Sequence, residues 1–397
     1  ALDFSANTLS MYVDGLLVAQ NTNLTTSDWS GNNGMGISDA NSGVGGNYNG
    51  NLSDFGPYDG QLANVRIHSQ ALSLEAVQSL NKAAKLAGTL LNFDARAGEA
   101  KFNSGGSLTW QSLTGVSGFN WQFSPDVRLE SGLTTNTHFE QAFAFGGLAG
   151  GSAPSLFGTT GDPTSQSTSF EIWFRPDDLE GQEVLLEIGG LTSGTSFTIN
   201  GDVLQLLTAG GSSDTMLSHP LGSLDDFVQA VGVIDFEDET LSLYVNGQLA
   251  LQPVSIPGYQ QWADNNPMGL GQKTGDLGGD YSRKLTDYGA FAGRIAALRI
   301  YPATLSAEEI QNLYRSSTLD LLVDYDASLD TDADLIWENT TATSDMDLNL
   351  AAGAARQSVA SSRYPQLIAA RRFGDRTFVG LSGLTGIGQG VDSTQVL

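Results

Sequence analysis

The sequence predicts an all-β protein built from tandem antiparallel β-sandwich modules, each of which ends in a short helix. Three observations lead to this prediction. Glycine accounts for 48 of the 397 residues and charged residues for only 16%, a composition that suits short strands joined by many turns. Many short segments alternate between apolar and polar residues, as half-buried strands do. A long stretch of sequence also occurs more than once, which is typical of an array of similar modules.

The repeated stretch is clearest in two matching pairs of segments. Residues 9–15 (LSMYVDG) return as residues 241–247 (LSLYVNG), and residues 52–56 (LSDFG) return as residues 285–289 (LTDYG). The offset is 232 residues at the first match (241 − 9) and 233 at the last (285 − 52). A module of this length is ordinary for a single all-β sandwich.

Module boundaries are expected where the repeat turns polar or small and then restarts. The restart is seen in residues 90–95 (LLNFDA), which match residues 322–327 (LVDYDA). We therefore expect residues 1–88 to be the C-terminal part of one module, residues 89–317 to be a complete module, and residues 318–397 to be the N-terminal part of a further module.

The clearest predicted strands form a hairpin in each copy. Residues 241–245 (LSLYV) alternate in polarity, and Asn246 and Gly247 follow them. This pair readily adopts the positive φ angles of a tight two-residue hairpin turn. Asp14 and Gly15 stand at the same point of the first copy, so the same turn is expected there.

A second alternating strand is predicted over residues 293–301 (GRIAALRIY). Strict alternation puts Ile295, Ala297 and Arg299 on one face of this strand and Leu298 on the other. Both faces contain apolar residues, so both are expected to be at least partly covered.

A short helix is predicted over residues 306–315. Ser306 and Glu309 have the spacing of a capping box, in which each side chain binds the backbone N–H of the other residue. Ile310 and Leu313 follow at the spacing of an apolar helical stripe. The helix should therefore bury one face.

The middle module contains four further apolar runs, bounded by glycine, aspartate and asparagine, as in a sandwich of many strands. These runs are residues 169–176 (SFEIWFRP), 184–188 (VLLEI), 196–199 (SFTI) and 203–207 (VLQLL).

The order of four segments resembles a known family. Residues 170–176 (FEIWFRP), 243–247 (LYVNG), 291–301 (FAGRIAALRIY) and 305–310 (LSAEEI) are similar to the laminin-G-like, concanavalin A-like jelly-roll domain repeats of large bacterial surface or adhesin proteins. The resemblance covers the whole middle module and implies a jelly roll. It says little about the ligand, because this superfold carries lectins, adhesion modules and glycosidases alike.

Charge and composition exclude several classes of partner. The chain has 18 Lys and Arg against 44 Asp and Glu, a net charge of −26. This acidic balance is opposite to that of a nucleic-acid binder. No apolar run approaches the roughly 18 residues needed to span a bilayer, so no membrane insertion of this segment is expected. The chain has no cysteine, which excludes disulfides and thiolate metal sites.

One strand resembles a catalytic motif but lacks its reactive groups. Retaining endo-glucanases of the same superfold read Glu-x-Asp-x-Glu along a strand, and residues 233–237 (VIDFE) are similar. Val233 stands at the nucleophile position, and the equivalent residues 1–5 (ALDFS) lack both outer carboxylates. Because glycoside hydrolysis uses a pair of carboxylates, we expect no enzymatic activity. Asp235 and Asp3 are expected to bind turn amides instead.

The best candidate for ligand chemistry is an acidic, glycine-rich loop that precedes the last strand of each copy. Its candidate calcium ligands are Asn47 and Asp54 in the first copy and Asp280 and Asp287 in the middle copy. Calcium takes six to eight oxygen ligands from carboxylates, amides and backbone carbonyls. Laminin-G-like domains often hold calcium, so the resemblance also implies such a site. The alternative is that these residues only cap turns in a solvated loop.

Two tryptophans, Trp29 and Trp262, lie beside this loop in the two copies. An exposed tryptophan can stack on the face of a sugar, although anchoring in a core or loop is its commoner use. Surface carbohydrate is therefore a candidate partner.

The resemblance implies a non-catalytic repeat segment of an exported bacterial surface protein, extracellular or at the cell surface, that serves adhesion or forms an extracellular filament or sheath. Its expected partners are neighbouring modules or subunits of the same protein, which would complete the partial modules at residues 1–88 and 318–397. The alternative function is the carbohydrate-binding module region of a larger secreted hydrolase.

Overall fold

The structure of the protein is a computed structural model. It describes residues 1–25, 58, 60–62, 64–68, 70–85, 91–95, 101–102, 108–113, 120–131, 133, 139, 141–155, 167–189, 194–210, 213–222, 226–257, 267–273, 285, 287–317, 321–326, 336–337, 348–350, 355–358, 369–373 and 379–380. The chain divides into two compact units. We call Ala87–Tyr314 the middle unit, and Ala1–Leu86 together with Arg315–Leu397 the split unit.

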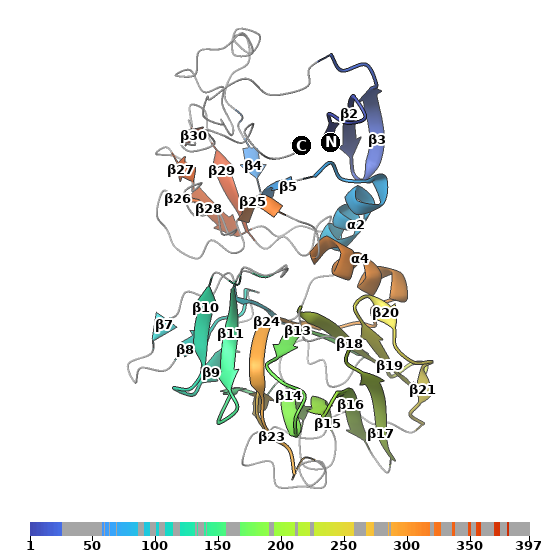
Figure 1. Cartoon of the computed structure of the whole chain (residues 1–397), viewed down its shortest axis with the longest axis vertical. Helices are drawn as coiled ribbons and strands as arrows, with labels where there is room; N and C mark the ends of the chain where they lie inside the picture. Colours follow the sequence, from blue (N-terminus) through green and yellow to red (C-terminus); the bar gives the residue numbers. More distant parts are fainter. Residues whose placement is uncertain are drawn as a thin grey trace. The chain divides into compact units, whose positions relative to one another are not determined.

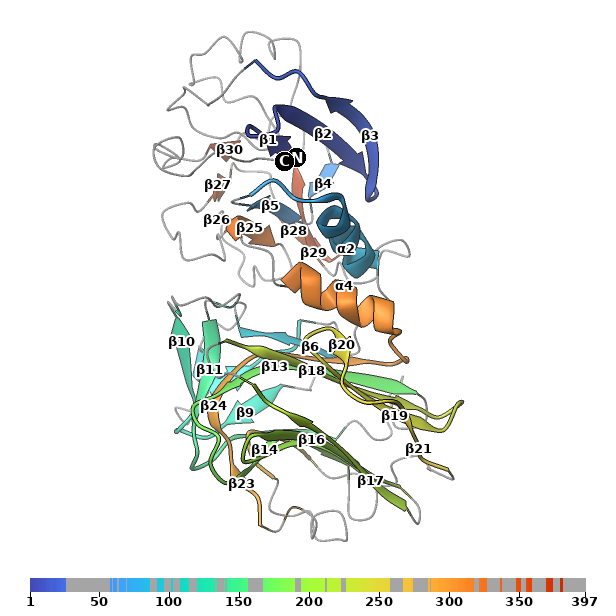
Figure 2. The same ribbon diagram turned by 45° about the vertical axis from the view of Figure 1, so that its right-hand side comes forward.

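The middle unit contains two layers of strands, which are most easily seen in Figure 2. The first sheet has the order β10-β11-β24-β13-β18-β19-β20; β6 also pairs with β24, and β21 with β19. Its strands are β6 (Leu91–Asp94), β10 (Arg128–Ser131), β11 (Gln141–Gly146), β13 (Thr168–Pro176), β18 (Val228–Asp235), β19 (Thr240–Val245), β20 (Gln248–Leu249), β21 (Val254–Ser255) and β24 (Ala292–Tyr301).

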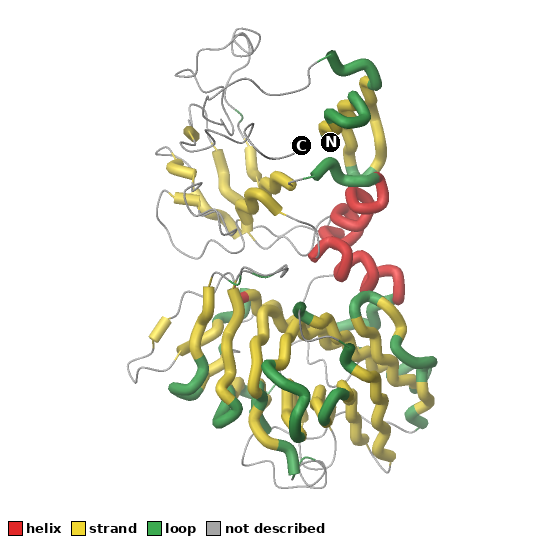
Figure 3. Tube along the Cα trace, in the orientation of Figure 1, coloured by secondary structure: helices red, strands yellow, loops and turns green. Residues whose placement is uncertain are grey.

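The second sheet has the order β17-β16-β15-β14-β22-β12-β9-β8-β7. Its strands are β7 (Lys101–Phe102), β8 (Leu108–Trp110), β9 (Trp121–Phe123), β12 (Gly151–Ala153), β14 (Gln182–Gly189), β15 (Gly194–Asn200), β16 (Val203–Gly210), β17 (Ser213–Pro220) and β22 (Met268–Leu270). These neighbours pair antiparallel, whereas β23 (Gly289–Ala290) pairs parallel with β14. Strands dominate the described residues, as Figure 3 shows, so the all-β prediction is confirmed.

Apolar side chains from both sheets form one core in the middle unit. On β13, Phe170, Ile172 and Phe174 are fully buried in this core. The intervening Glu171 and Trp173 are also fully buried, but their side chains lie on the opposite, outer face of the first sheet. Both faces of β13 are therefore covered.

One strand departs from the predicted alternation. The sequence predicts that Ile295 shares a face with Arg299, but Ile295 lies in the main core. The register between β13 and β24 shifts between Trp173 and Phe174, and the residue left over on β24 is Ala296. Such a β-bulge inserts one residue into a strand and so reverses the alternation beyond it. A long-range pairing, rather than local sequence, decides this reversal.

The predicted helix and its cap are confirmed. The helix α4 (Ala307–Ser317) follows Ser306, whose backbone N–H donates to the Glu309 carboxylate at 2.8 Å. The Glu309 N–H donates in return to the Ser306 hydroxyl at 3.3 Å. Ile310 and Leu313 are buried, as their spacing predicts. None of the described helices has the length and apolar character of a membrane-spanning helix.

The predicted hairpin turns are also confirmed. Asn246 and Gly247 have φ angles of 50° and 75°, and Asp14 and Gly15 have φ angles of 53° and 78°. These left-handed angles are those of a two-residue turn whose twist matches the flanking strands.

The split unit pairs strands from both of its chain segments (Figure 1). β25 (Leu321–Asp326) pairs antiparallel with β5 (Asn64–His68), and β29 (Ala369–Phe373) pairs antiparallel with β4 (Gly60–Leu62). Its other elements are β1 (Leu2–Asp3), β2 (Thr8–Val13), β3 (Leu16–Asn21), α2 (Leu74–Lys85), β26 (Ile336–Trp337), β27 (Leu348–Leu350), β28 (Ala355–Ser358) and β30 (Val379–Gly380).

The β25–β5 pair repeats a register of the middle unit. Asn92 of β6 lies opposite Arg299 of β24, and Asp324 of β25 lies opposite Arg66 of β5. These pairs stand at matching positions of the sequence repeat. The two segments of the split unit thus supply each other with a strand partner at this point. Their assignment as parts of separate modules stays a prediction.

Candidate functional site

Only one of the predicted calcium ligands lies among the described residues. Asp287 is exposed and lies in a turn between Leu285 and Tyr288. The other three lie outside the described residues: Asn47, Asp54 and Asp280. Within the described part of the chain, no group of three or more His, Cys, Asp or Glu residues is arranged to hold a metal ion. Calcium binding therefore stays a prediction.

The turn that contains Asp287 lies against the outer face of the second sheet. Leu285 is fully buried and packs with Val184 and Ala209 of that sheet. Its backbone carbonyl accepts hydrogen bonds from the Lys273 ammonium at 2.8 Å and from the Tyr288 N–H at 3.0 Å. The end of the predicted ligand loop therefore covers part of this face.

Four polar side chains lie on the same outer face, and we call them the polar strip: Glu187 of β14, Ser196 and Thr198 of β15, and Gln205 of β16. Glu187 lies opposite Ser196, and Thr198 lies opposite Gln205. None of the four is more than 6% exposed. These four residues were not predicted as a site from the sequence. The available signal was that each of these polar residues interrupts or borders an apolar run.

Hydrogen bonding in the polar strip is incomplete among the described residues. The Gln205 side-chain oxygen accepts from the Tyr288 hydroxyl at 2.7 Å and from the Thr198 hydroxyl at 3.3 Å. In contrast, the hydroxyl of the fully buried Ser196 has no hydrogen-bond partner in the part of the chain that the structure describes. A buried polar group without a partner costs free energy, and one explanation is a water or ligand that completes the site. The polar strip is therefore the candidate ligand site.

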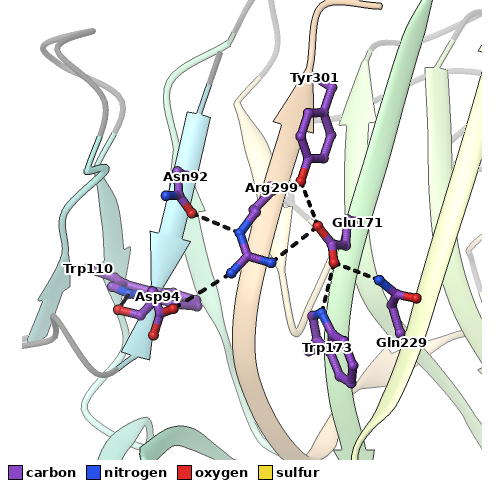
Figure 4. Close-up of polar contacts among 8 residues, drawn as sticks. All are labelled: Asn92, Asp94, Trp110, Glu171, Trp173, Gln229, Arg299 and Tyr301. Carbon is purple, nitrogen blue, oxygen red and sulfur yellow. Dashed lines mark hydrogen bonds and ion pairs between the residues drawn. The ribbon is translucent and has the colours of Figure 1, made fainter. Parts of the chain in front are cut away.

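A second polar cluster lies on the outer face of the first sheet and surrounds Glu171 (Figure 4). One carboxylate oxygen accepts from Trp173 Nε1 and from Gln229 Nε2, both at 2.8 Å. The other accepts from the Tyr301 hydroxyl at 2.8 Å and from Arg299 Nη1 at 3.2 Å. This cluster joins the neighbouring strands β13, β18 and β24.

Arg299 lies between two carboxylates of this cluster, those of Glu171 and Asp94. Burial alone would raise the pKa of the Glu171 carboxyl, but the Arg299 charge and three neutral donors hold that pKa below its ordinary value. Arg299 also lies 3.7 Å from the Asp94 carboxylate, and its Nε donates to the Asn92 side chain at 3.1 Å. Burial lowers the pKa of Arg299, but the negative charge of Glu171 more than reverses this, so that pKa is raised. The ion pair is therefore ionised at neutral pH.

The Glu171 cluster is a structural element rather than a ligand site. Both oxygens of Glu171 already accept two hydrogen bonds each, so the carboxylate has little capacity left for a ligand. Gln229 carries the network onward, because its side-chain oxygen accepts from the Gly247 N–H at 3.1 Å. The cluster thus fixes the hairpin turn to the centre of the sheet.

The strand that resembles the glucanase motif has the predicted structural role. One oxygen of Asp235 accepts from the backbone N–H groups of Glu237 at 2.9 Å and Asp238 at 3.1 Å. One oxygen of Asp3 likewise accepts from the Ala6 N–H at 2.9 Å. Both aspartates bind turn amides, as expected. Trp29 and Trp262 lie outside the described residues.

Comparison with known proteins identifies the domain. No curated protein sequence matches the chain. A family model described as the concanavalin A-like lectin/glucanases superfamily matches residues 149–311.

Several solved structures share a distant likeness. The CBM40 of the Ruminococcus gnavus IT-sialidase is 14% identical, with 44% of this chain and 96% of that chain covered and a TM-score of 0.36. The binding domain of botulinum neurotoxin DC is 14% identical, with 58% and 52% covered and a TM-score of 0.39. A Trypanosoma rangeli sialidase is 14% identical, with 61% and 38% covered and a TM-score of 0.41. Likenesses this distant carry no inference about ligand or activity.

The family match and the layered antiparallel sheets agree with each other. Residues 149–311 therefore form a laminin-G-like jelly-roll domain of the concanavalin A-like lectin/glucanase superfamily.

Proposed function

We propose that the laminin-G-like domain is a non-catalytic recognition domain that binds surface carbohydrate through the polar strip and serves adhesion. The observation that carries this proposal is the fully buried Ser196 hydroxyl, which has no partner among the described residues. The superfamily includes lectins, which supports a sugar as the ligand class. Because one fold can host many functions, the proposal rests on the residues of the polar strip as well as on the fold.

The chemistry of the strip suits a sugar. Sugar hydroxyls both donate and accept hydrogen bonds, and the strip offers a carboxylate, an amide and two hydroxyls. Binding sites commonly combine a few such polar groups with apolar walls, and here Leu285 and Tyr288 pack beside the strip. Because the strip is buried, ligand binding by this route requires the turn that contains these two residues to move aside.

The wider setting is part of the same proposal. We propose that the chain is a repeat segment of an exported bacterial surface protein, extracellular or at the cell surface, in an adhesive assembly or an extracellular filament or sheath. A second candidate, favoured by the same polar strip, is the carbohydrate-binding module region of a larger secreted hydrolase.

A glycan array tests the sugar proposal. The labelled chain of residues 1–397 should bind a defined subset of glycans, and Ser196→Ala should weaken that binding by about tenfold through the loss of one or two hydrogen bonds. This variant removes no hydrogen bond that the described residues make, so its melting temperature should stay unchanged. Ser242→Ala on β19 of the first sheet, at a side chain that is 7% exposed, is the control and should bind as the unchanged chain does. Absence of glycan binding, or equal binding by Ser196→Ala, would reject the proposal.

Calcium binding by Asn47, Asp54, Asp280 and Asp287 is a separate proposal. An ion that binds only the folded chain raises its melting temperature by mass action. Calcium should therefore stabilise the chain relative to EGTA, and Asp287→Asn should reduce the gain, whereas Glu237→Gln in another exposed turn should not. Identical melting curves in calcium and EGTA would exclude the site.

A further inference from the structure

A line of small and polar residues crosses the second sheet of the middle unit. In each of six neighbouring strands, from β8 to β15, one such residue lies directly opposite its counterpart in the next strand. We call these residues the cross-strand line: Thr109, Gln122, Ser152, Gly269, Glu187 and Ser196. Directly opposite residues share one face of a sheet, so the line forms a continuous row.

The cross-strand line lies on the outer face of the second sheet. Most of the residues that directly precede or follow it in the chain belong to the core between the two sheets: Leu108, Trp110, Trp121, Phe123, Ala153, Leu186, Ile188, Phe197, Met268 and Leu270. Successive side chains of a strand point to opposite faces, so the line faces away from this core. Glu187 and Ser196 also belong to the polar strip. The polar strip is thus one end of a longer row.

The two ends of the cross-strand line differ in exposure. The three residues from β22, β14 and β15 are buried. In contrast, Gln122 on β9 is exposed, and Thr109 and Ser152 are half-buried. The Thr109 hydroxyl donates to the Gln122 side-chain oxygen at 3.1 Å, so neighbouring members of the line are close enough to bind the same small group. A ligand can therefore reach the end at β8, β9 and β12 from solvent.

The length of the cross-strand line follows from the spacing of the strands. Five strand-to-strand steps separate Thr109 from Ser196. At about 4.8 Å a step, the line is about 24 Å long, which is much longer than one sugar ring. Beyond Ser196, the apolar residues Leu207 and Met216 continue the same register, so the polar part ends at β15. At the other end, Lys101 of the edge strand β7 lies opposite Thr109.

The side chains of the cross-strand line suit a neutral sugar chain. Their hydroxyl and amide groups both donate and accept hydrogen bonds, as sugar hydroxyls do. From Thr109 to Ser196 the line has one carboxyl group, that of Glu187, and no cationic side chain. Arg and Lys are the usual partners of anionic groups, so a chain of acidic sugars would find no such partner along this row.

We propose that the ligand of the polar strip is an extended neutral polysaccharide, which lies across the second sheet along the cross-strand line and contacts Gln122 as well as Ser196. This inference rests on the proposed function, because it extends the polar strip into a longer site. Thr109 and Gln122 precede residues 149–311, so this part of the site lies outside the family match. Successive sugar units meet successive strands, so affinity depends on chain length, unlike binding of a single terminal sugar in a pocket.

Oligosaccharides of defined length test this inference. Isothermal titration calorimetry with the chain of residues 1–397 compares disaccharides and hexasaccharides of neutral glucans, xylans and mannans. In a series that binds, the hexasaccharide should bind at least about tenfold more tightly than the disaccharide, as expected for one or two additional hydrogen bonds. A hexamer of galacturonic acid, which has a carboxylate on each unit, should bind at least about tenfold more weakly than the neutral hexasaccharide.

A substitution at the exposed end of the cross-strand line tests its extent. Gln122→Ala should lower the affinity for the hexasaccharide by about tenfold and reduce the difference between the two chain lengths. The Gln122 side chain is exposed, so the melting temperature of this variant should stay nearly unchanged. Gln248→Ala, at an exposed glutamine of β20 in the first sheet, is the matched control and should bind as the unchanged chain does.

The possible results separate this inference from the proposed function. Suppose that the glycan array shows binding that depends on Ser196. Equal affinity for both chain lengths, unchanged binding by Gln122→Ala, equal binding of the galacturonic acid hexamer, or no binding of any neutral series would then overturn the extended site and leave the proposed function in place. Absence of binding to every array glycan and every oligosaccharide would overturn both.

Discussion

Glu171 shows how a charged residue is tolerated in the interior of this protein. Its side chain is fully buried and accepts hydrogen bonds from four side chains, one of which is the positively charged Arg299. Removing one member of a buried ion pair leaves the other charge buried without a partner. The loss of folding free energy is then larger than the net stabilisation that the intact pair provides.

We therefore expect Glu171→Ala to lower the free energy of unfolding by about 3–5 kcal/mol. Urea denaturation followed by tryptophan fluorescence measures this change. Glu180→Ala, at an exposed position that follows β13, is the control and should change stability by less than about 0.5 kcal/mol. A loss of less than about 1 kcal/mol for Glu171→Ala would show that the cluster does not hold the sheet together.

Glu183 is a carboxyl whose environment favours its neutral form. Burial raises its pKa to about 7, with smaller contributions from the negative charges of Asp178 and Asp177, although the Ala292 N–H partly opposes them. Between the ordinary pKa of 4.5 and about 7, the folded chain keeps a proton that the unfolded chain has lost. The contribution of Glu183 to stability therefore falls as pH rises through this range.

Glu183→Gln should accordingly raise the melting temperature at pH 8 and leave it nearly unchanged at pH 4. Differential scanning calorimetry at both pH values measures the difference, with Glu180→Gln as the exposed control. An equal effect of Glu183→Gln at the two pH values would contradict the assigned pKa.

At the scale of elements, the hairpin between β19 and β20 depends on close approach of the helix α4. Gly247 has a φ angle of 75°, and a Cβ atom there would lie 2.9 Å from the Cβ of Tyr314. Tyr314 in turn stacks on Trp173 with ring centroids 5.8 Å apart. A side chain at position 247 would therefore strain the backbone and displace the helix from the sheet.

Gly247→Ala should lower the free energy of unfolding by at least about 2 kcal/mol, the sum of backbone strain and overpacking. Gly181 provides a matched control, because its φ angle is 83° and no atom lies within 4 Å of an added Cβ. Gly181→Ala should therefore show only the backbone strain, about 1 kcal/mol. Chemical denaturation compares the two, and equal losses would show that contact with Tyr314 does not matter.

At the scale of the whole molecule, the two units differ in how completely they bury their apolar residues. The middle unit has one continuous core that includes Leu241 and Leu243, whereas the matching residues of the split unit are about half exposed. Stability depends on buried apolar area, so the split unit should open at a lower free energy.

Limited proteolysis should therefore remove parts of the split unit first and leave a resistant fragment close to residues 87–317. A time course read by intact mass spectrometry measures this order. Cleavage of the middle unit first would contradict the assigned difference in stability.

Local sequence was sufficient to predict the features that depend on neighbouring residues. The turns at Asn246-Gly247 and Asp14-Gly15, the capping box at Ser306 and the turn contacts of Asp235 all agree with the structure. Each depends on backbone geometry or hydrogen bonds within a few residues, which the side chains at those positions favour directly.

Tertiary structure decided what depends on residues far apart in the chain. Glu171 meets Arg299 and Tyr301 only because β13 and β24 become neighbours. Ser196 is buried only in the folded sheet, where its hydroxyl has no hydrogen-bond partner among the described residues. The segments LSMYVDG and LSLYVNG are nearly identical, yet Leu9 is half exposed and Leu241 is fully buried. Sequence therefore determined that both segments form the same hairpin. Whether the apolar side chains are buried was decided by the strands that pack against each hairpin, because burial is a property of the neighbours in space.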